Sequence, residues 1–301
     1  MRTESSFSVT LGRLRLANPV MTASGTFGYG QEYEAYTDVN RLGAIVVKGI
    51  SLEPRAGNPP PRAVETPAGM LNAIGLENVG LERFLAEKLP YLRTLNTKVV
   101  VNILGGRVKD YARLASELSQ AEGVAAVEVN VSCPNVASGG LAFGLSVSSV
   151  YELTKTVRRA VGDGFPVIVK LSPEAPDLPS VCAALEDAGA DAASLINTIR
   201  GMAFDINTGK PRLSTGIGGL SGPAIRPIAV RMVYECAQKT RLPLIGIGGI
   251  VSAADAAEFI LAGASAVQVG TANLVNPNAA VEVLEGLTKW LRARRAPQES
   301  I

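Results

Sequence analysis

Residues 126–135 read AVEVNVSCPN, and the rest of the chain is organised around this stretch. Its first half alternates small apolar and polar residues like a buried strand, and Pro134 ends it abruptly. The strand therefore delivers Asn130, Ser132, Cys133 and Asn135 to the point where the chain leaves the sheet. Because active sites of α/β barrels lie at the C-terminal ends of parallel strands, we expect chemistry here.

Seven further apolar segments resemble the first, and helical patterns lie between most of them. The predicted strands are 18–24, 44–50, 98–104, 126–133, 166–171, 192–198, 243–247 and 266–271. The predicted helices are 108–121, 147–161, 178–188, 224–239 and 253–262, with a closing amphipathic helix over 282–295. Eight nearly continuous apolar strands in about 300 residues predict an α/β fold, a closed (β/α)8 TIM barrel.

Three other features complete the predicted architecture. Residues 7–16 read as an N-terminal β-hairpin that plugs the bottom of the barrel. The long connections 51–96 and 200–222 belong to the C-terminal face, where lids and specificity loops are built. Since no Pro/Gly/Ser linker interrupts the chain, residues 1–301 are expected to form a single domain.

The composition narrows the class of protein. The chain has 301 residues, is 47% apolar and carries a net charge of +2, which gives no argument for a nucleic-acid or anionic-membrane partner. No apolar run is long enough to span a membrane, and the N-terminus lacks a signal-peptide layout, so a cytoplasmic location is expected. The chain contains no histidine, which excludes the commonest general base and most zinc sites, and no metal site is expected.

The three cysteines, Cys133, Cys182 and Cys236, form no disulfide framework and are too few for a four-thiolate iron–sulfur cluster. Cys182 and Cys236 lie inside helical patterns and read as small buried hydrophobic residues. Cys133 has polar neighbours, which favours a chemical role as nucleophile, ligand or base.

Amides and lysines collect at predicted strand ends. Asn102, Asn130 and Asn197 fall near strand ends and Asn72 lies in the first long connection. Several amides could grip the edge of a flat heterocycle, although a single Asn at such a place is usually a turn former. Lys48 and Lys170 also close strands; each either extends to solvent or stabilises negative charge on a cofactor ring.

Glycines mark the last two βα turns, at Gly246, Gly248 and Gly249 and at Gly270 before Thr271. The loops after strands seven and eight commonly bind phosphate in this fold, and Gly222 before Pro223 reads as another helix start. No G-x-G-x-x-G stretch has the strand–turn–helix setting of a Rossmann dinucleotide site.

Taken together, these motifs resemble the class 1 dihydroorotate dehydrogenases, most closely subclass 1B, over nearly the whole chain. The resemblance rests on NPVMTASGTFGYG (18–30), VVKGIS (46–51), GNPPPR (57–62), GMLNAIGLEN (69–78), VEVNVSCPN (127–135), VKLSP (169–173), NT (197–198), GGLSGPAIRPIA (218–229), IGIGGI (245–250) and ASAVQVGTA (264–272). One departure is Val79, where a proline is expected after the Asn, and it affects only the local loop.

The resemblance implies FMN as cofactor and oxidation of dihydroorotate to orotate in de novo pyrimidine (UMP) biosynthesis. Cys133 would be the base that removes the C5 proton while FMN takes the C6 hydride, and the loop with Gly139 and Gly140 could act as a lid. The implied cofactor-binding residues are Ser24, Lys48, Gly49, Asn102, Asn130, Lys170, Ile196, Gly222, Gly248, Gly249, Gly270 and Thr271. The implied substrate-binding residues are Lys48, Asn72, Ala73, Ile74, Gly75, Leu76, Asn130, Asn197 and Thr198.

The route by which electrons leave the flavin is expected to lie outside this chain. The chain has too few cysteines for an iron–sulfur cluster and no dinucleotide fingerprint. If NAD is the final acceptor, a partner subunit with FAD and an iron–sulfur cluster must carry the electrons; a homodimer is also expected. Other interpretations remain open from the residues: another FMN barrel such as a tRNA dihydrouridine synthase, a non-flavin phosphate-binding barrel, or a scaffold barrel without activity.

Overall fold

A closed barrel of eight parallel strands forms the centre of the computed structural model, which describes residues 7–131, 144 and 146–295. Strand β16 pairs with β3 and so closes the sheet. The strands are β3 (Val20–Thr22), β4 (Ala44–Ile50), β7 (Lys98–Ile103), β8 (Ala126–Asn130), β9 (Val167–Lys170), β10 (Ala192–Leu195), β15 (Leu244–Ile247) and β16 (Ala266–Val269). Each lies within a predicted segment, so the (β/α)8 prediction is confirmed.

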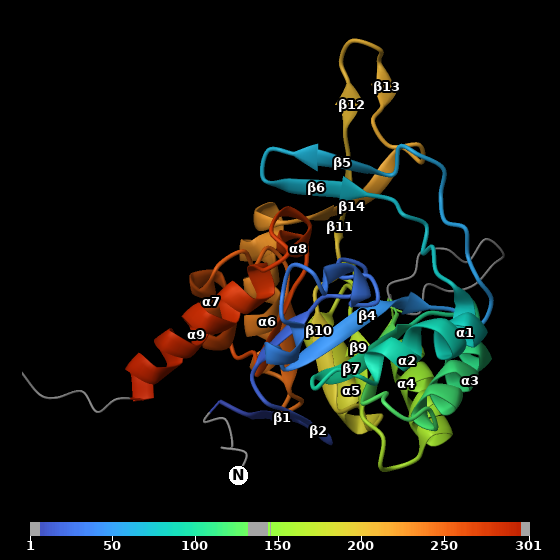
Figure 1. Ribbon diagram of the computed structural model, residues 1–301, viewed down its shortest axis with the longest axis vertical. Coiled ribbons are helices and arrows are strands. Elements are labelled where there is room, and N and C mark those ends of the chain that lie inside the picture. Colours follow the sequence, from blue (N-terminus) through green and yellow to red (C-terminus); the bar gives the residue numbers. More distant parts are fainter. Residues whose placement is uncertain (1–6, 132–143, 145, 296–301) are drawn as a thin grey trace, which may run out of the picture.

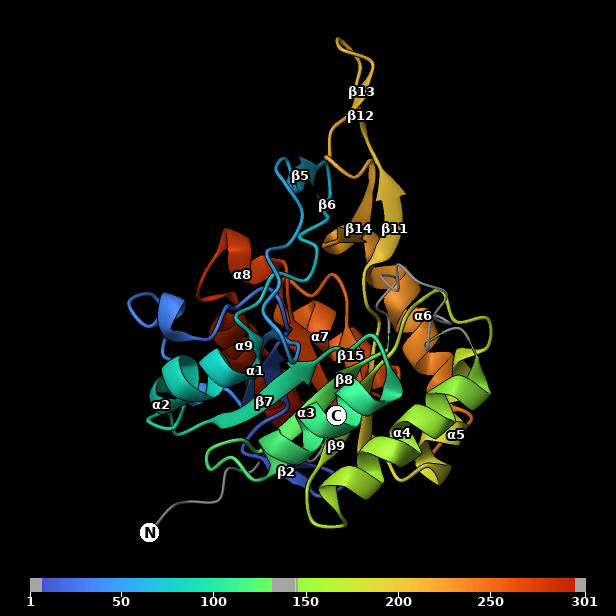
Figure 2. The same ribbon diagram turned by 90° about the vertical axis from the view of Figure 1, so that its right-hand side faces the viewer.

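Helices surround the barrel and cover its outer face (Figures 1 and 2). Those predicted from the sequence are α3 (Val108–Ser119), α4 (Val147–Val161), α5 (Leu178–Asp187), α6 (Arg226–Ala237) and α7 (Ala253–Leu261). Helix α3 shows why they form: Tyr111, Leu114, Ala115 and Leu118 recur at helical spacing and are all buried. The closing helix α9 (Ala279–Arg295) begins three residues before the predicted start at 282.

The N-terminal hairpin closes one end of the barrel, as predicted. Strands β1 (Val9–Leu11) and β2 (Leu14–Leu16) pair antiparallel. Leu11, Leu14 and Leu16 are buried against interior residues of the barrel such as Met21 and Val100. Burial of each leucine contributes about 1.5–3 kcal/mol, so the hairpin is a structural floor for the barrel.

The two long connections fold into a second sheet above the opposite end of the barrel, which the sequence analysis did not predict (Figure 1). Strands β5 (Ala63–Thr66) and β6 (Gly69–Asn72) come from the first connection, and β11 (Ile199–Met202) and β14 (Ile217–Ser221) from the second. The sheet order is β11-β14-β6-β5. A small hairpin, β12 (Phe204–Asp205) and β13 (Lys210–Pro211), projects beyond this sheet.

Several short helical segments were likewise not predicted. The first connection contains α1 (Gly80–Arg83), the π-helical turn η3 (Phe84–Lys88) and α2 (Leu89–Leu92), which bury Phe84, Leu89 and Leu92. Others are η1 (Gln31–Tyr33), η2 (Val39–Arg41), η5 (Pro223–Ile225) and α8 (Ala272–Val275). These pieces are too short to show a full amphipathic period in the sequence.

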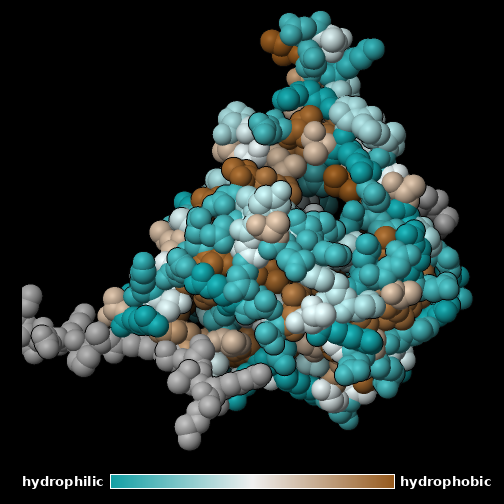
Figure 3. Space-filling model, in the orientation of Figure 1, coloured by the Kyte–Doolittle hydropathy of each residue, from teal (hydrophilic) through white to brown (hydrophobic). Residues whose placement is uncertain are grey.

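On the face shown in Figure 3 most residues are hydrophilic, and some hydrophobic ones lie around the base of the projecting hairpin. Phe204, Ile206 and Ile217 are exposed in this part of the chain. Among the described residues, no helix combines the length and the apolar character that a membrane crossing requires.

Candidate active site at the C-terminal mouth of the barrel

A buried lysine marks the end of strand β9. Lys170 is 5% exposed, and its Nζ donates a hydrogen bond to Ser24 Oγ at 3.2 Å. Lys170 also lies beside Asn130, the last residue of β8, in the parallel register. Within the described part of the chain, no carboxylate oxygen comes within 4 Å of Lys170. Because a buried cation is costly without an anion, this lysine is suited to an electron-rich ligand at the mouth.

The neighbouring strands bring more predicted residues to the same mouth. Lys48 and Gly49 lie in β4, and a Cβ on Gly49 would lie 2.9 Å from Asn102 Oδ1 of β7. Gly49 therefore allows the amide of Asn102 to approach the backbone. Ile196 directly follows β10; the Leu195–Ile196 peptide bond is cis, and Ile196 N–H donates to the carbonyl of Ile247 at 3.0 Å.

The predicted phosphate-binding residues also converge. Gly222, Gly248 and Gly249 have φ values of 95°, 128° and 72°, which favour glycine. A Cβ on Gly249 would lie 2.8 Å from the carbonyl oxygen of Gly222, so these two turns touch. The hydroxyl of Thr271 donates to Ser221 Oγ at 2.8 Å, which joins the turn after β16, with Gly270, to the same group. Closely approaching backbone turns of this kind form a concavity that suits a phosphate.

The predicted substrate segment follows β6 at the edge of the upper sheet. Asn72 Nδ2 donates to the carbonyl of Gly219 at 3.4 Å, and a Cβ on Gly219 would collide with Thr198. Asn72 and Thr198 are therefore neighbours through Gly219, although they are far apart in the sequence. Asn197 precedes Thr198 and accepts its N–H through Oδ1 at 2.8 Å.

The remainder of this segment, Ala73, Ile74, Gly75 and Leu76, is held by the loop before β5. Ala73 N–H donates to the carbonyl of Arg62 at 2.8 Å, and Asn58 donates to the carbonyls of Ala73 and Ile74 at 2.8 and 2.9 Å. Leu76 has a φ of 60°, the one positive value among the described non-glycine residues. These bonds fix the backbone of the segment in one conformation.

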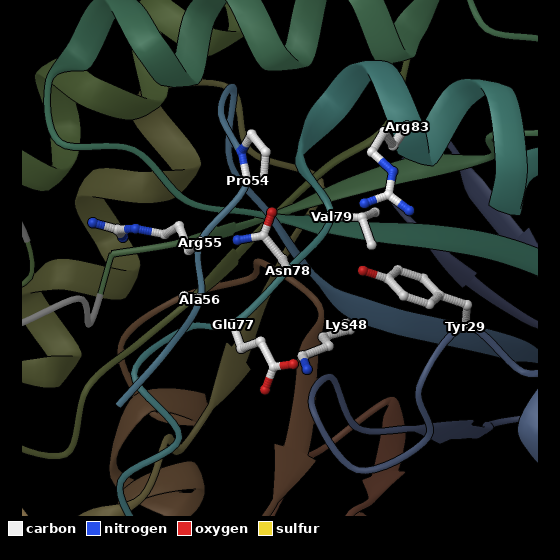
Figure 4. Close-up of a pocket in the computed structure, with 9 residues that line it drawn as sticks. All are labelled: Tyr29, Lys48, Pro54, Arg55, Ala56, Glu77, Asn78, Val79 and Arg83. Carbon is white, nitrogen blue, oxygen red and sulfur yellow. The ribbon is translucent and has the colours of Figure 1, made fainter. Parts of the chain in front are cut away.

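A cavity of about 520 Å³ opens beside Lys48 (Figure 4). In the figure, the side chains of Lys48 and Glu77 point toward one another, and the Tyr29 hydroxyl points into the cavity. Burial raises the pKa of Tyr29 above its ordinary value. The lining residues are Tyr29, Lys48, Pro54, Arg55, Ala56, Glu77, Asn78, Val79 and Arg83. The cavity thus extends from a predicted substrate-binding lysine toward the surface.

Two of the three cysteines lie in the described part of the chain, and both are buried in helices as predicted. Cys182 and Cys236 are fully buried in α5 and α6. A hydrogen bond with Cys236, together with burial, raises the pKa of Cys182 well above its ordinary value, as in an inert structural thiol. Cys133 and the loop with Gly139 and Gly140 lie outside the described residues, so the predicted base and lid remain predictions.

A polar cluster inside the barrel was missed by the sequence analysis. Glu128 of β8 is fully buried and accepts hydrogen bonds from Asn102, Ser194 and Gln268. The period of two places Glu128 on the same face of β8 as Asn130, which was recognisable in the sequence. Its partners come from three other strands, which only the closed barrel brings together.

Buried polar side chains at the C-terminal mouth of a closed parallel barrel, beside touching glycine turns, define the chain as a (β/α)8 barrel enzyme with its site at the usual end. A family model described as dihydroorotate dehydrogenase matches residues 6–291, and the chain belongs to this family. The identification made from the sequence motifs, including the enzyme class, is confirmed.

Individual proteins of this family are similar to the chain over nearly its whole length. The chain is 53% identical over 286 residues to the dihydroorotate dehydrogenase B (NAD(+)), catalytic subunit, of Desulforamulus reducens, with 95% of this chain and 93% of the relative covered. It is 55% identical to the protein of the same name from Pelobacter propionicus, with 94% and 93% covered. The corresponding Trichlorobacter lovleyi protein is 54% identical, with 96% and 94% covered.

Proposed function

We propose that this chain is the catalytic subunit of an NAD-linked dihydroorotate dehydrogenase, which oxidises dihydroorotate to orotate in pyrimidine biosynthesis. The proposal is supported by family membership and by relatives that carry this name at more than 50% identity. The structural observation that carries it is the buried Lys170, which lies beside Asn130 and Ser24 and lacks a carboxylate partner within the described residues.

The residues present fit FMN as cofactor. The glycine turns at Gly222 and Gly249 approach so closely that a Cβ on Gly249 would lie 2.8 Å from the carbonyl oxygen of Gly222, and closely packed turns of this kind suit a phosphate. Gln268 Oε1, a buried acceptor in the barrel interior, has no hydrogen-bond partner among the residues that the structure describes. The residues proposed to hold FMN are Ser24, Lys48, Gly49, Asn102, Asn130, Lys170, Ile196, Gly222, Gly248, Gly249, Gly270 and Thr271. Bound FMN would supply the acceptor for the C6 hydride.

The chain's own residues would bind and orient the substrate. Lys48 would attract the carboxylate of dihydroorotate, and amides such as Asn72, Asn130 and Asn197 would pair with the ring amides. Thr198 and the backbone from Ala73 to Leu76 would complete this binding site. Lys170 would offset negative charge that develops on the reduced ring.

Cys133 is the proposed base that removes the C5 proton. The chain contains no histidine, and Cys133 follows Asn130 by three residues at the end of the same predicted strand. The two other cysteines are buried in helices, which leaves Cys133 as the thiol for this role.

A partner subunit with FAD and an iron–sulfur cluster is proposed to pass the electrons to NAD. The words "catalytic subunit" and "NAD(+)" in the relatives' names support it. We further propose that the chain forms a homodimer and acts in the cytoplasm.

The decisive experiment is anaerobic addition of dihydroorotate to the purified yellow protein. Bleaching of the flavin absorbance is expected, and Cys133→Ser should slow it by orders of magnitude near neutral pH because a hydroxyl is a much poorer base than a thiolate. A colourless protein, or a flavin that dihydroorotate leaves oxidised, would contradict the proposal.

A further inference from the structure

A carboxylate lies in the middle of the barrel interior, where an apolar residue would be less costly. Glu128 is fully buried, and no lysine or arginine nitrogen of the described chain lies within 4 Å of it. It accepts three hydrogen bonds: from Asn102 Nδ2 at 2.7 Å, Ser194 Oγ at 2.9 Å and Gln268 Nε2 at 2.8 Å. Burial of a carboxylate without a counterion is expensive even when it is hydrogen-bonded, so its presence calls for a role.

The position of Glu128 suggests what that role is. Ala126, two residues before it, belongs to the apolar layer that the N-terminal hairpin closes. Asn130, two residues after it on the same face of β8, is paired in register with Lys170 at the mouth. Glu128 therefore lies one layer below the proposed flavin site, between the apolar floor of the barrel and the lysine that faces the ligand.

Glu128 also determines how Asn102 is oriented. Only the NH₂ end of an amide can face a carboxylate, so Nδ2 of Asn102 points to Glu128 and Oδ1 is directed away. The Oδ1 end is the one that approaches Gly49, since a Cβ there would lie 2.9 Å from it. Asn102 therefore presents an acceptor, not a donor, at a residue proposed to contact FMN.

We propose that Glu128 is a positioning residue that lowers the reduction potential of bound FMN, by fixing the amide of Asn102 and by placing a negative charge one layer below the residues proposed to hold it. This inference rests on the proposed function, because it requires FMN at the mouth. With FMN bound, the positive charge of Lys170 would favour negative charge on the reduced cofactor, and the negative charge of Glu128 would oppose it. The balance of the two charges sets how readily electrons leave the flavin.

The test is a spectroelectrochemical titration of FMN in the wild-type holoenzyme and in Glu128→Gln. Glutamine has nearly the same shape as glutamate but carries no charge. Its NH₂ group would also face at least one of the three groups that donate hydrogen bonds to Glu128. The equilibrium constant for two-electron reduction should rise about tenfold, which is a potential about 30 mV higher. An unchanged potential would overturn the inference.

The matched control is Ser194→Ala, which removes one hydrogen bond from the same cluster and leaves the charge of Glu128 in place. Its potential should stay close to that of the wild type; a shift as large as that of Glu128→Gln would show a merely structural disturbance. If Glu128→Gln does not retain FMN, Glu128→Asp provides the second test, because it keeps the charge and should change the equilibrium constant by less than about threefold. A larger change would also overturn the inference.

The outcome separates this inference from the proposed function. A wild-type protein without FMN, or one that dihydroorotate does not reduce, would contradict the proposed function itself. A wild-type protein that is reduced normally, with the same potential in Glu128→Gln, would overturn only the role of Glu128.

Discussion

At the scale of single residues, the clearest prediction concerns Gly249. A Cβ at this position would lie 2.7 Å from Arg226 Cβ and 2.8 Å from the carbonyl of Gly222, and φ is 72°. Gly249→Ala must therefore displace a turn of the proposed phosphate cradle. We expect the FMN dissociation constant to rise at least about tenfold, a loss of about 1.4 kcal/mol, measured by quenching of flavin fluorescence on binding.

The matched control for Gly249→Ala is Gly164→Ala. Gly164 also lies in a loop, but nothing approaches within 4 Å of a Cβ there. The control should bind FMN like the wild type. If both variants bound FMN with equal affinity, Gly249 would not belong to the proposed phosphate-binding site.

Residue-scale prediction worked where a polar side chain ends an apolar strand. Asn102, Asn130 and Lys170 were recognised because a strand pattern stops at or just after them, and the structure places all three at the barrel mouth. Glu128 escaped notice because it lies within the strand, where a single acidic residue has no meaning until its partners are known. Those partners, Ser194 and Gln268, are 66 and 140 residues away in the sequence.

At the scale of elements, Asp191 fastens the N-terminal hairpin and α4 to the barrel. Its carboxylate accepts from Arg158 Nη2 at 2.5 Å, Val167 N–H at 2.8 Å and Arg13 Nη1 at 2.9 Å. Burial lowers the pKa of Arg158, and Asp191 opposes that shift. Asp191→Ala leaves Arg158 without its anion, so we expect a loss of about 3–5 kcal/mol in the free energy of unfolding, measured by urea denaturation.

Arg13→Ala provides the comparison for Asp191→Ala. The Arg13 side chain is 42% exposed, so its loss should cost at most about 1 kcal/mol. Similar losses in the two variants would contradict the assignment of Asp191 as the central anion of this contact.

Helix α5 carries a carboxylate with a lowered pKa at each end. Hydrogen bonds from Ser180 lower the pKa of Asp177, and hydrogen bonds from Thr240 and Arg241 lower that of Glu186. A pKa that is lower in the folded state gives stability above the ordinary carboxyl range near pH ~4, which is lost as the pH falls through the folded pKa. Glu186→Gln should therefore lower the thermal midpoint at pH 7, and the difference from the wild type should shrink toward pH 3. A difference that stays constant would argue against a titrating contact.

Element-scale prediction succeeded for the barrel and failed for the upper sheet. Long apolar strands and helices with a full period carry their own pattern, so their approximate ranges could be predicted. Strand β6 instead pairs with β14, which begins 145 residues later. β6 contains one glycine and β14 two, and both strands contain partly exposed residues. Nothing in either segment alone specifies the other as its partner.

At the scale of the whole molecule, the proposed partner subunit makes a direct prediction. The purified chain with FMN should be reduced by dihydroorotate but should reduce NAD slowly, because the sequence contains no dinucleotide fingerprint and only three cysteines. Stopped-flow spectroscopy would follow the flavin and the formation of NADH separately. Fast NADH formation by this chain alone would remove the need for a partner subunit.

The sequence by itself determined the barrel, its plug and the family, because apolar periodicity and ordered motifs are local properties of the chain. The mutual placement of Lys170 and Ser24, the contact of the glycine turns and the sheet above the mouth were decided only by the tertiary structure. Each depends on strand ends that closure of the barrel brings together across 50 to 150 residues of sequence. Closure of the barrel also buries Glu128 among its hydrogen-bond partners, one layer below the proposed cofactor site.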